Sequence, residues 1–328
     1  MAGEHIEHLI STQFDAWPEA VAATARVTVA EPLLFCGSGS SYYLAVVAAD
    51  VARRLGIQAS ALPSADCVLE PDLAFPNGIG TVIVISRSGA TTEALWAARA
   101  ARAAGARVLA FPCSPQSPLG EDASQSVVLP QGEDHTVVMI RSFTTLLMAL
   151  QALLARHRGQ SVPEARLRAA GPALVAAGRA RLAPWFGERR LRRLVVLGGG
   201  VRWGIALEGM LKALEMTDQP AVAFVPLEYR HGPWGALTGD DGVILLTRAV
   251  SFSHDRRLTE ELRQRTDHVL TVGAGEADVA WPAEEALADL WTGPLAIAPL
   301  QVLAWRWALS VGLDPDRPPN LTKVVDLS

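Results

Sequence analysis

Short apolar segments that each run into a glycine- or serine-rich turn and then a helix form the dominant pattern of this sequence. Residues 33–36 lead into the turn 37–42, and residues 81–85 lead into the turn 86–91. Two more strands and three helices are expected at 107–111, 126–129, 44–55, 92–104 and 142–157. Since parallel strands are joined by helical crossovers, this alternation predicts an α/β fold with helices on both faces of a parallel sheet.

The pattern restarts in the second half of the chain. A strand at 194–197 precedes a Gly-Gly-Gly turn and a helix over 205–216, and another strand follows at 242–246. One offset of 161 residues aligns Gly37 with Gly198 and also Ser86 with Thr247. A constant offset between two strand-turn-helix units predicts a duplicated α/β domain.

These patterns predict four segments. They are an N-terminal helical segment at 1–30, a first domain at 31–158, an Ala- and Arg-rich helical connector at 159–189, and a second domain at 190–328 that ends in a C-terminal arm. The opening helix is expected over 4–30 despite Pro18. Each domain should be a three-layer αβα sandwich of the flavodoxin-like type.

Composition excludes several classes of protein. Half of the 328 residues are hydrophobic, 19% are charged, and the net charge of −5 comes without a run of five like charges, which argues against disorder and a nucleic-acid-binding tail. Three scattered cysteines fit reduced cytosolic thiols better than disulfides or a zinc site. The acidic start and the Pro-interrupted apolar stretch at 290–305 argue against a signal peptide and a membrane span. We therefore expect a cytoplasmic protein.

Lysine is scarce in this chain. Only Lys212 and Lys323 are lysines among 29 basic residues, and the others are arginines. An amine can lose its proton and attack a carbonyl, whereas a guanidinium stays charged. The two lysines are therefore candidates for chemistry that needs an amine, with codon bias as the alternative explanation.

The two Ser/Gly-rich turns are candidate phosphate-binding loops. Each follows a buried strand and begins a helix, where free N–H groups and the helix dipole favour an anion. Hydroxyl groups and close-approach glycines suit such a cradle: Ser41, Ser86, Ser88 and Thr91, with Gly37, Gly39 and Gly89. Simple helix N-caps are the alternative.

Two sequence comparisons narrow the phosphate hypothesis. At the offset of 161 the second half has Arg202, Ala249 and Phe252 in place of Ser41, Ser88 and Thr91, so phosphate is expected in the first half alone. Nucleotide motifs fail, because Tyr42 and Trp203 occupy the last glycine position of GxGxxG and there is no P-loop.

Three further segments contain candidate catalytic groups. Glu208, Lys212 and Glu215 are spaced i, i+4 and i+7 on one helix and share a face, which indicates either a solvated ion-pair stripe or charges kept inside for use. His231 precedes Gly-Pro in a turn, where a structural role is the alternative. The proline-stiffened arm at 314–325 holds Lys323.

Taken together, these segments resemble the double SIS (sugar isomerase) domain family of phosphosugar isomerases and aminosugar-phosphate deaminases. The resemblance covers essentially the whole chain and rests on six motifs in the family's order. They are Gly-Ser-Gly-Ser-Ser-Tyr at 37–42, Ser-Arg-Ser-Gly-Ala-Thr at 86–91, Arg-Ser-Phe-Thr at 141–144, the helix at 206–215, Leu-Glu-Tyr-Arg-His-Gly-Pro at 227–233 and Pro-Pro-Asn-Leu-Thr-Lys at 318–323.

The resemblance implies roles for particular residues. The sugar-phosphate cradle would comprise Ser41, Ser86, Arg87, Ser88 and Thr91, with Gly39, Asp134 and Val137 as further substrate-binding candidates. Glu215 would move the proton between C1 and C2, and Lys212 and Lys323 would be the active-site lysines. His231 would open the sugar ring from a neighbouring subunit, which implies a homodimer.

The function expected from the resemblance is isomerisation and deamination of a hexosamine 6-phosphate or related sugar phosphate, without cofactor, metal, nucleic acid or membrane. Met139, Ile140 and Arg141 replace the family's usual Ser-Thr-Lys, so the sugar itself stays open. The alternatives are a deglycase for fructosamine 6-phosphates and a non-catalytic phosphosugar sensor. The histidines show no HxH or HExxH spacing typical of a metal site.

Overall fold

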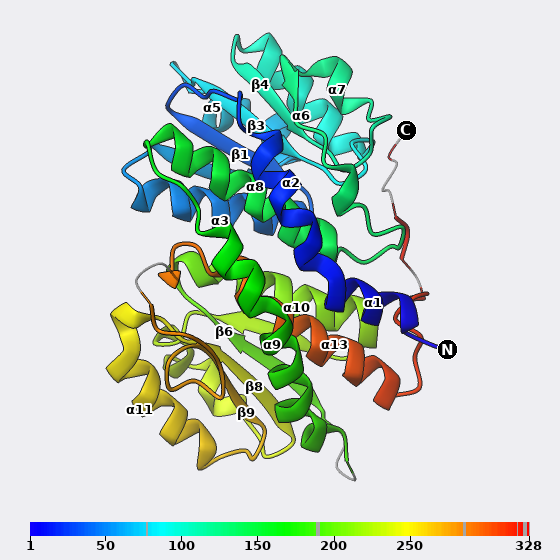
Figure 1. Cartoon of the computed structure of the whole chain (residues 1–328), viewed down its shortest axis with the longest axis vertical. Coiled ribbons are helices and arrows are strands. Elements are labelled where there is room, and N and C mark those ends of the chain that lie inside the picture. Colours follow the sequence, from blue (N-terminus) through cyan, green and yellow to red (C-terminus); the bar gives the residue numbers. More distant parts are fainter. Residues whose placement is uncertain (77, 188–190, 285–286, 320, 324–326, 328) are drawn as a thin grey trace. The chain divides into compact units, whose positions relative to one another are not determined.

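The chain forms two compact units (Figure 1). The computed structural model describes residues 1–76, 78–187, 191–284, 287–319, 321–323 and 327. The N-terminal unit comprises Thr12–Glu164 and Thr322–Ser328. The C-terminal unit comprises Met1–Ser11 and Ala165–Leu321.

The N-terminal unit is built on a five-stranded parallel sheet with the strand order β2-β1-β3-β4-β5. Its strands are β1 (Leu33–Gly37), β2 (Ala59–Pro63), β3 (Thr81–Ile85), β4 (Arg107–Phe111) and β5 (Gln125–Ser126). Its helices are η1 (Gln13–Ala16), α2 (Trp17–Ala23), α3 (Ser40–Arg54), α4 (Asp66–Leu69), α5 (Pro71–Ala74), α6 (Thr92–Ala103), α7 (Leu119–Asp122), η2 (Pro130–Gly132) and α8 (Arg141–His157).

The central strands of this sheet are buried on both faces. Every residue of β1 and β3 is buried, as expected for apolar strands that are covered by helices on each side. Leu34, Val82 and Val84 pack with the alanines of α6 in one core cluster. Since alternate side chains point to opposite faces, Leu33 and Phe35 face the other layer, where α3 packs against α8.

The C-terminal unit has the same strand order, since β10-β9-β8-β6-β7 read backwards matches the first sheet position by position. All neighbouring strands are parallel: β6 (Arg193–Leu197), β7 (Ala221–Phe224), β8 (Asp241–Leu246), β9 (Val269–Ala274) and β10 (Val279–Trp281). Its helices are α1 (Glu4–Thr12), α9 (Glu164–Leu182), η3 (Ala183–Phe186), η4 (Gly200–Arg202), α10 (Trp203–Thr217), η5 (Glu228–Arg230), η6 (Pro233–Ala236), η7 (Ala249–Ser251), α11 (Phe252–Arg263), α12 (Gly293–Ala296) and α13 (Ala298–Ser310). The predicted fold class, two tandem parallel α/β sandwiches, is confirmed.

Helices again cover the sheet of the C-terminal unit. Leu258 and Leu262 of α11 pack with Val243 and Leu245 of β8 in one apolar cluster. The buried Tyr229 and Leu237 belong to the same cluster, so the loop between them is anchored in this core. α10 packs against α13, which places the helix of the predicted charged stripe inside the unit.

Some predicted boundaries differ from the structure. The helix expected over 4–30 is three short helices that end at Ala23, because Pro18 starts α2 rather than continuing α1. The strand expected at 126–129 is limited to Gln125–Ser126, and β2, β7, β9 and β10 had no predicted counterpart. The predicted segment 1–30 is divided between the two units, and the end of the arm groups with the N-terminal unit.

Across the described part of the chain, no helix is both long enough and apolar enough to span a bilayer.

Candidate functional site

The first candidate site lies at the carboxyl end of β1 in the N-terminal unit, where the chain turns into α3. A Cβ on Gly37 would lie 2.5 Å from the carbonyl carbon of Ser41, so only glycine lets the turn fold back this closely. Gly39 has a φ of 55° and is the N-cap residue of α3. Ser41 is buried in the first turn of this 15-residue helix.

The loop that follows β3 is folded by its own hydroxyl groups. The Ser86 hydroxyl accepts a hydrogen bond from the Gly89 N–H at 3.1 Å, and Ser88 Oγ accepts one from the Ala90 N–H at 3.2 Å. Gly89 has a φ of 65°, and a Cβ there would lie 1.7 Å from Ser117 Oγ. The sequence from 86 to 91 therefore specifies one loop shape, with Ser88 partly exposed.

Thr91 distinguishes this loop from an ordinary helix start. It is the N-cap residue of α6, yet its side chain makes no capping hydrogen bond. Its Oγ1 instead lies 3.5 Å from Ser86 Oγ. The alternative explanation was that these hydroxyls serve only as helix caps. Thr91 does not fit that explanation, because its hydroxyl makes no capping hydrogen bond.

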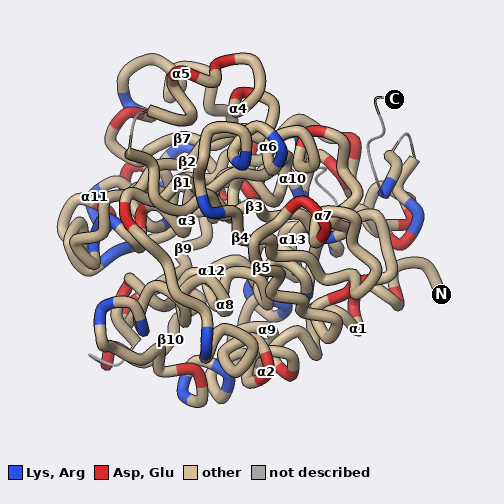
Figure 2. The backbone as a smooth tube through the Cα atoms, turned by 90° about the horizontal axis from the view of Figure 1, so that it is seen from above, with Lys and Arg blue, Asp and Glu red and all other residues tan. Residues whose placement is uncertain are grey.

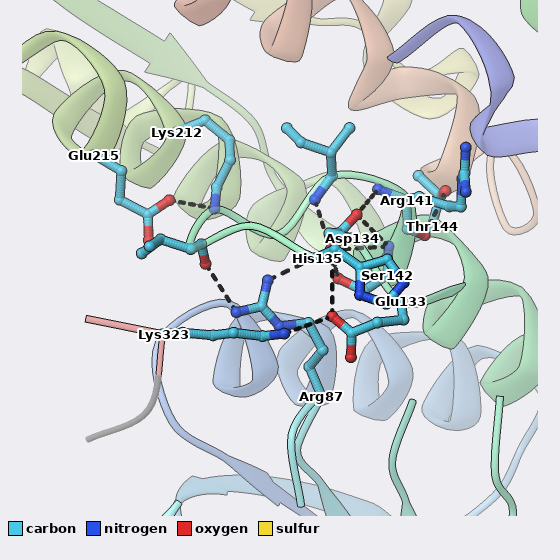
Figure 3. A network of polar contacts seen from close by, with 12 residues as sticks. Arg87, Glu133, Asp134, His135, Arg141, Ser142, Thr144, Lys212, Glu215 and Lys323 are labelled. Carbon is cyan, nitrogen blue, oxygen red and sulfur yellow. Dashed lines mark hydrogen bonds and ion pairs between the residues drawn. The ribbon is translucent and has the colours of Figure 1, made fainter. Parts of the chain in front are cut away.

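Arg87 and Asp134 form a buried ion pair that ties this loop to the start of α8 (Figure 3). Arg87 Nη1 lies 3.5 Å from Asp134 Oδ2, and Nη2 donates to the Val137 carbonyl at 2.9 Å. The Asp134 carboxylate accepts the Arg141 N–H at 2.7 Å and the Ser142 N–H at 3.2 Å. It thereby satisfies backbone donors that the first turn of a helix leaves unpaired.

The ionisation of Asp134 reflects this environment. Full burial raises the pKa of its carboxyl group above the ordinary value, although Arg87 and the hydrogen bonds from Ser142 oppose the shift. Among the predicted substrate-binding residues, Arg87 and Asp134 thus connect this loop to the start of α8, and the Val137 carbonyl accepts a further bond from Arg87.

Lys323 of the C-terminal arm is paired with Glu133 in the same unit. Its Nζ donates to Glu133 Oε1 at 3.0 Å, and the same oxygen accepts the His135 N–H at 3.1 Å. Burial alone would raise the pKa of Glu133, but Lys323 and the His135 N–H outweigh burial and bring it below the ordinary value. Sequence reasoning missed Glu133; its one signal was a carboxylate beside Asp134 in a polar turn.

The charged stripe of α10 is buried in the C-terminal unit. Lys212 is fully buried, its Nζ lies 3.2 Å from Glu208 Oε1, and it is hydrogen-bonded to Glu215 Oε2. Burial would lower the pKa of Lys212, but Glu208 and Glu215 together raise it above the ordinary value. Lys212 is thus held as an ammonium ion, which is not a nucleophile.

The two carboxylates of this stripe differ in exposure. Glu208 is fully buried, whereas the Glu215 side chain is 19% exposed. Glu208 was part of the predicted stripe but not of the predicted site residues. Its burial beside Lys212 shows that the stripe is not the solvated ion-pair surface that was the alternative.

His231 lies in the loop between η5 and η6 of the C-terminal unit, with an exposed side chain. Its backbone N–H donates to the Glu228 carbonyl at 2.9 Å. Among the described residues, no set of three His, Cys, Asp or Glu side chains is arranged to hold a metal ion.

Comparisons with known proteins identify what this chain is similar to. Residues 28–156 match the SIS domain family. Glutamine–fructose-6-phosphate aminotransferase (isomerizing) of Pyrobaculum aerophilum is 28% identical over 348 residues, which cover 97% of this chain and 57% of that protein. The chain spans about half the length of the curated relatives that it matches.

Two solved structures share the fold along nearly the whole chain. The crystal structure of glucosamine-6-phosphate deaminase from Thermotoga maritima has a TM-score of 0.86 at 26% identity, over 98% of this chain and 99% of that one. Tagatose-6-phosphate ketose/aldose isomerase from Escherichia coli has a TM-score of 0.83 at 22% identity, over 96% and 95%. The second likeness bears on the fold alone.

Proposed function

We propose that this chain is a tandem SIS-domain enzyme that deaminates and isomerises a hexosamine 6-phosphate. Support comes from the match of residues 28–156 to the SIS domain family and from the fold shared with the glucosamine-6-phosphate deaminase structure. The reaction would be a proton transfer between C1 and C2 of the open-chain sugar. The likeness to the glucosamine-6-phosphate deaminase structure over both chains supports this choice over plain aldose-ketose isomerisation.

Phosphate binding is assigned to the N-terminal unit. The loops at 37–41 and 86–91 lead into α3 and α6 with small residues, and Ser88 and Thr91 are half-buried residues with hydroxyl side chains. Hydroxyls and backbone N–H groups at a helix start suit a phosphate dianion. Arg87 stabilises this loop by pairing with Asp134 and by donating a hydrogen bond to the Val137 carbonyl.

Proton transfer is assigned to Glu215. As a base it would take the proton from C2, giving an enolamine, and would return the proton to C1. The product is an imine at C2, and water then releases ammonia and leaves the ketose 6-phosphate. The Lys212 ammonium would stabilise the negative charge that develops on O1 during this transfer.

The observation that carries the proposal is the burial of Lys212 between Glu208 and Glu215. Removing the charges of Lys212 and Glu208 from water is expensive, and a buried ion pair contributes little to stability on its own account. A sensor protein that only binds phosphate would not need this buried cluster of charged side chains. The raised pKa of Lys212 also favours charge stabilisation over an imine to this lysine.

We further infer that His231 opens the ring of a sugar bound to a second copy of the chain. Its side chain is exposed, so a sugar bound to a second copy could reach the imidazole. Two inactive variants, Glu215→Gln and His231→Ala, should then complement each other. Mixed dimers contain one intact pair of residues, so a mixture would regain about a quarter of the wild-type activity, from the symmetry of the dimer. No recovery would refute the shared histidine.

One assay tests the proposed reaction. Purified protein is offered the 6-phosphates of glucosamine, galactosamine, glucose, fructose and tagatose, and both ammonia and the isomeric sugar are measured. Ammonia released in equal amount with a ketose 6-phosphate supports deamination. Isomerisation without ammonia release would show that the protein is a plain aldose-ketose isomerase and not a deaminase. Turnover of a fructosamine 6-phosphate alone would indicate a deglycase. Binding of a sugar phosphate without any turnover would indicate a non-catalytic phosphosugar sensor.

A further inference from the structure

Trp234 lies three residues after His231, and two arginine guanidinium groups lie over its ring. The Arg265 guanidinium carbon is 4.6 Å from the centroid of the Trp234 ring, and that of Arg230 is 5.9 Å from it. Arg265 follows the end of α11, along which Figure 2 marks both basic and acidic residues. A cation over an indole face is the strongest of the cation–aromatic contacts.

A second link joins the same loop to α11. Arg230 Nη1 lies 2.6 Å from Glu261 Oε2, and Glu261 is also paired with Arg257 at 3.1 Å. Arg230 is the residue directly before His231. The histidine is therefore flanked by a salt bridge to α11 on one side and by the stacked Trp234 on the other.

The core beneath the loop fixes its two ends. Tyr229 is 1% exposed, and its ring is 5.5 Å from Phe224 and 5.8 Å from Trp234 between centroids. Leu237, at the other end, is 8% exposed in the same apolar cluster. The chain between these anchors is short, so few backbone conformations are open to it.

His231 itself has no such anchor. In the part of the chain that the structure describes, its imidazole is exposed and enters no hydrogen bond, ion pair or ring contact. Its direction is therefore set by the loop backbone and not by partners of its own. An imidazole that must meet a sugar oxygen needs placement to within a fraction of an ångström.

We propose that Trp234, clamped by Arg265 and by the Arg230–Glu261 pair, is the positioning residue for His231. The clamp holds the loop backbone, and the backbone aims the imidazole. This inference rests on the proposed function for the catalytic use of His231, whereas the clamp itself is a property of the C-terminal unit. Trp234 would not touch the sugar.

A double-mutant cycle tests the clamp through activity. Trp234→Leu should lower kcat about ten- to a hundredfold with little change in KM, since a small misplacement of a catalytic group has effects of this size. Trp234→Phe, which keeps a stacked ring, should retain most of the activity. In a His231→Ala background Trp234→Leu should cause no further loss. An equal loss in both backgrounds would overturn the proposal, because Trp234 would then not act through His231.

A spectroscopic readout makes the test independent of turnover. The imidazole Cε1–H signal of His231, identified by its loss in His231→Ala, should shift or broaden in Trp234→Leu and in the milder Arg265→Gln. It should stay unchanged in the matched control Arg257→Gln, which removes a Glu261 partner that does not stack on Trp234. An unchanged signal in Arg265→Gln and Trp234→Leu would overturn the clamp. A His231→Ala variant with full kcat would instead refute the proposed role of His231.

Discussion

The two sheets of this protein share one strand order, but their carboxyl edges are chemically different. In the N-terminal unit the second turn presents Ser88 and Thr91 at the start of α6. In the C-terminal unit the corresponding positions, 161 residues later, are Ala249 and Phe252. A common fold therefore places a hydroxyl-bearing edge in one unit and an edge without those hydroxyls in the other.

In the C-terminal unit, carboxylates of the chain itself bind the donor groups at the carboxyl edge of the sheet. Asp289 Oδ2 accepts the Ala249 N–H at 2.8 Å, and its Oδ1 lies 3.2 Å from Nη2 of the buried Arg202. Asp255 accepts the Arg248 N–H at 3.1 Å. A backbone N–H beside a guanidinium suits an anion, and here the chain supplies that anion itself. In the C-terminal unit, the Ala249 and Arg248 N–H groups at this edge are thus already paired with carboxylates of the chain.

This contrast suggests a division of labour. The N-terminal unit would bind the phosphate, and the C-terminal unit would supply the buried charges for proton transfer. Substitutions in the first unit should then change KM, and substitutions of the α10 charges should change kcat.

The largest effect is expected for Glu215→Gln. Removal of the general base should lower kcat by about 10²–10⁴-fold, while the affinity for the sugar phosphate persists. Steady-state kinetics together with calorimetric binding of the substrate measure both quantities. Retained turnover would show that Glu215 is not the general base. It would also contradict the proposed assignment of proton transfer to the C-terminal unit.

The next effect is expected for Ser88→Ala combined with Thr91→Ala. Two hydrogen bonds to a charged phosphate are each worth about 1.5–3 kcal/mol, so KM for the phosphorylated sugar should rise by about 10²-fold or more. The unphosphorylated sugar should be affected far less. An equal rise for both sugars would argue against the cradle.

The matched control in the other unit is Thr247→Ala combined with Ser251→Ala. Thr247 donates to the Val272 carbonyl, and Ser251 donates to Asp255 at 2.7 Å, so both hydroxyls are used internally. The melting temperature should fall modestly, and KM should stay within about twofold, as for substitutions away from a site. A rise in KM like that of the cradle variant would erase the contrast between the two edges.

A smaller effect is expected for Glu133→Gln. Its pair with the part-exposed Lys323 is worth about 0.2–1 kcal/mol, so activity should fall only a few-fold. Charge reversal in both positions, Glu133→Lys with Lys323→Glu, should restore the ion pair but not the activity. Proteolysis of the C-terminal arm reports the pairing, and full activity of the reversed pair would show that Lys323 is not needed as an amine.

Much of the fold was predictable because it depends on local order along the chain. The strands at 81–85 and 107–111 were predicted to the residue, since apolar strands between turns are legible in the sequence. The edge strands β2 and β10 were not, because β2 is only partly apolar and partly buried and β10 has only three residues. The opening helix failed at Pro18, which favours the first turn of a helix over its interior.

The sequence by itself determined the strand-turn-helix rhythm, the small residues of the two turns, and the common face of Glu208, Lys212 and Glu215. These features depend on neighbours within a few residues, where periodicity and backbone freedom decide. The tertiary structure alone decided that Lys212 is buried as an ammonium ion and that Lys323 pairs with Glu133, 190 residues away. Burial and pairing of charges depend on which distant segments pack together, and no local pattern encodes that choice.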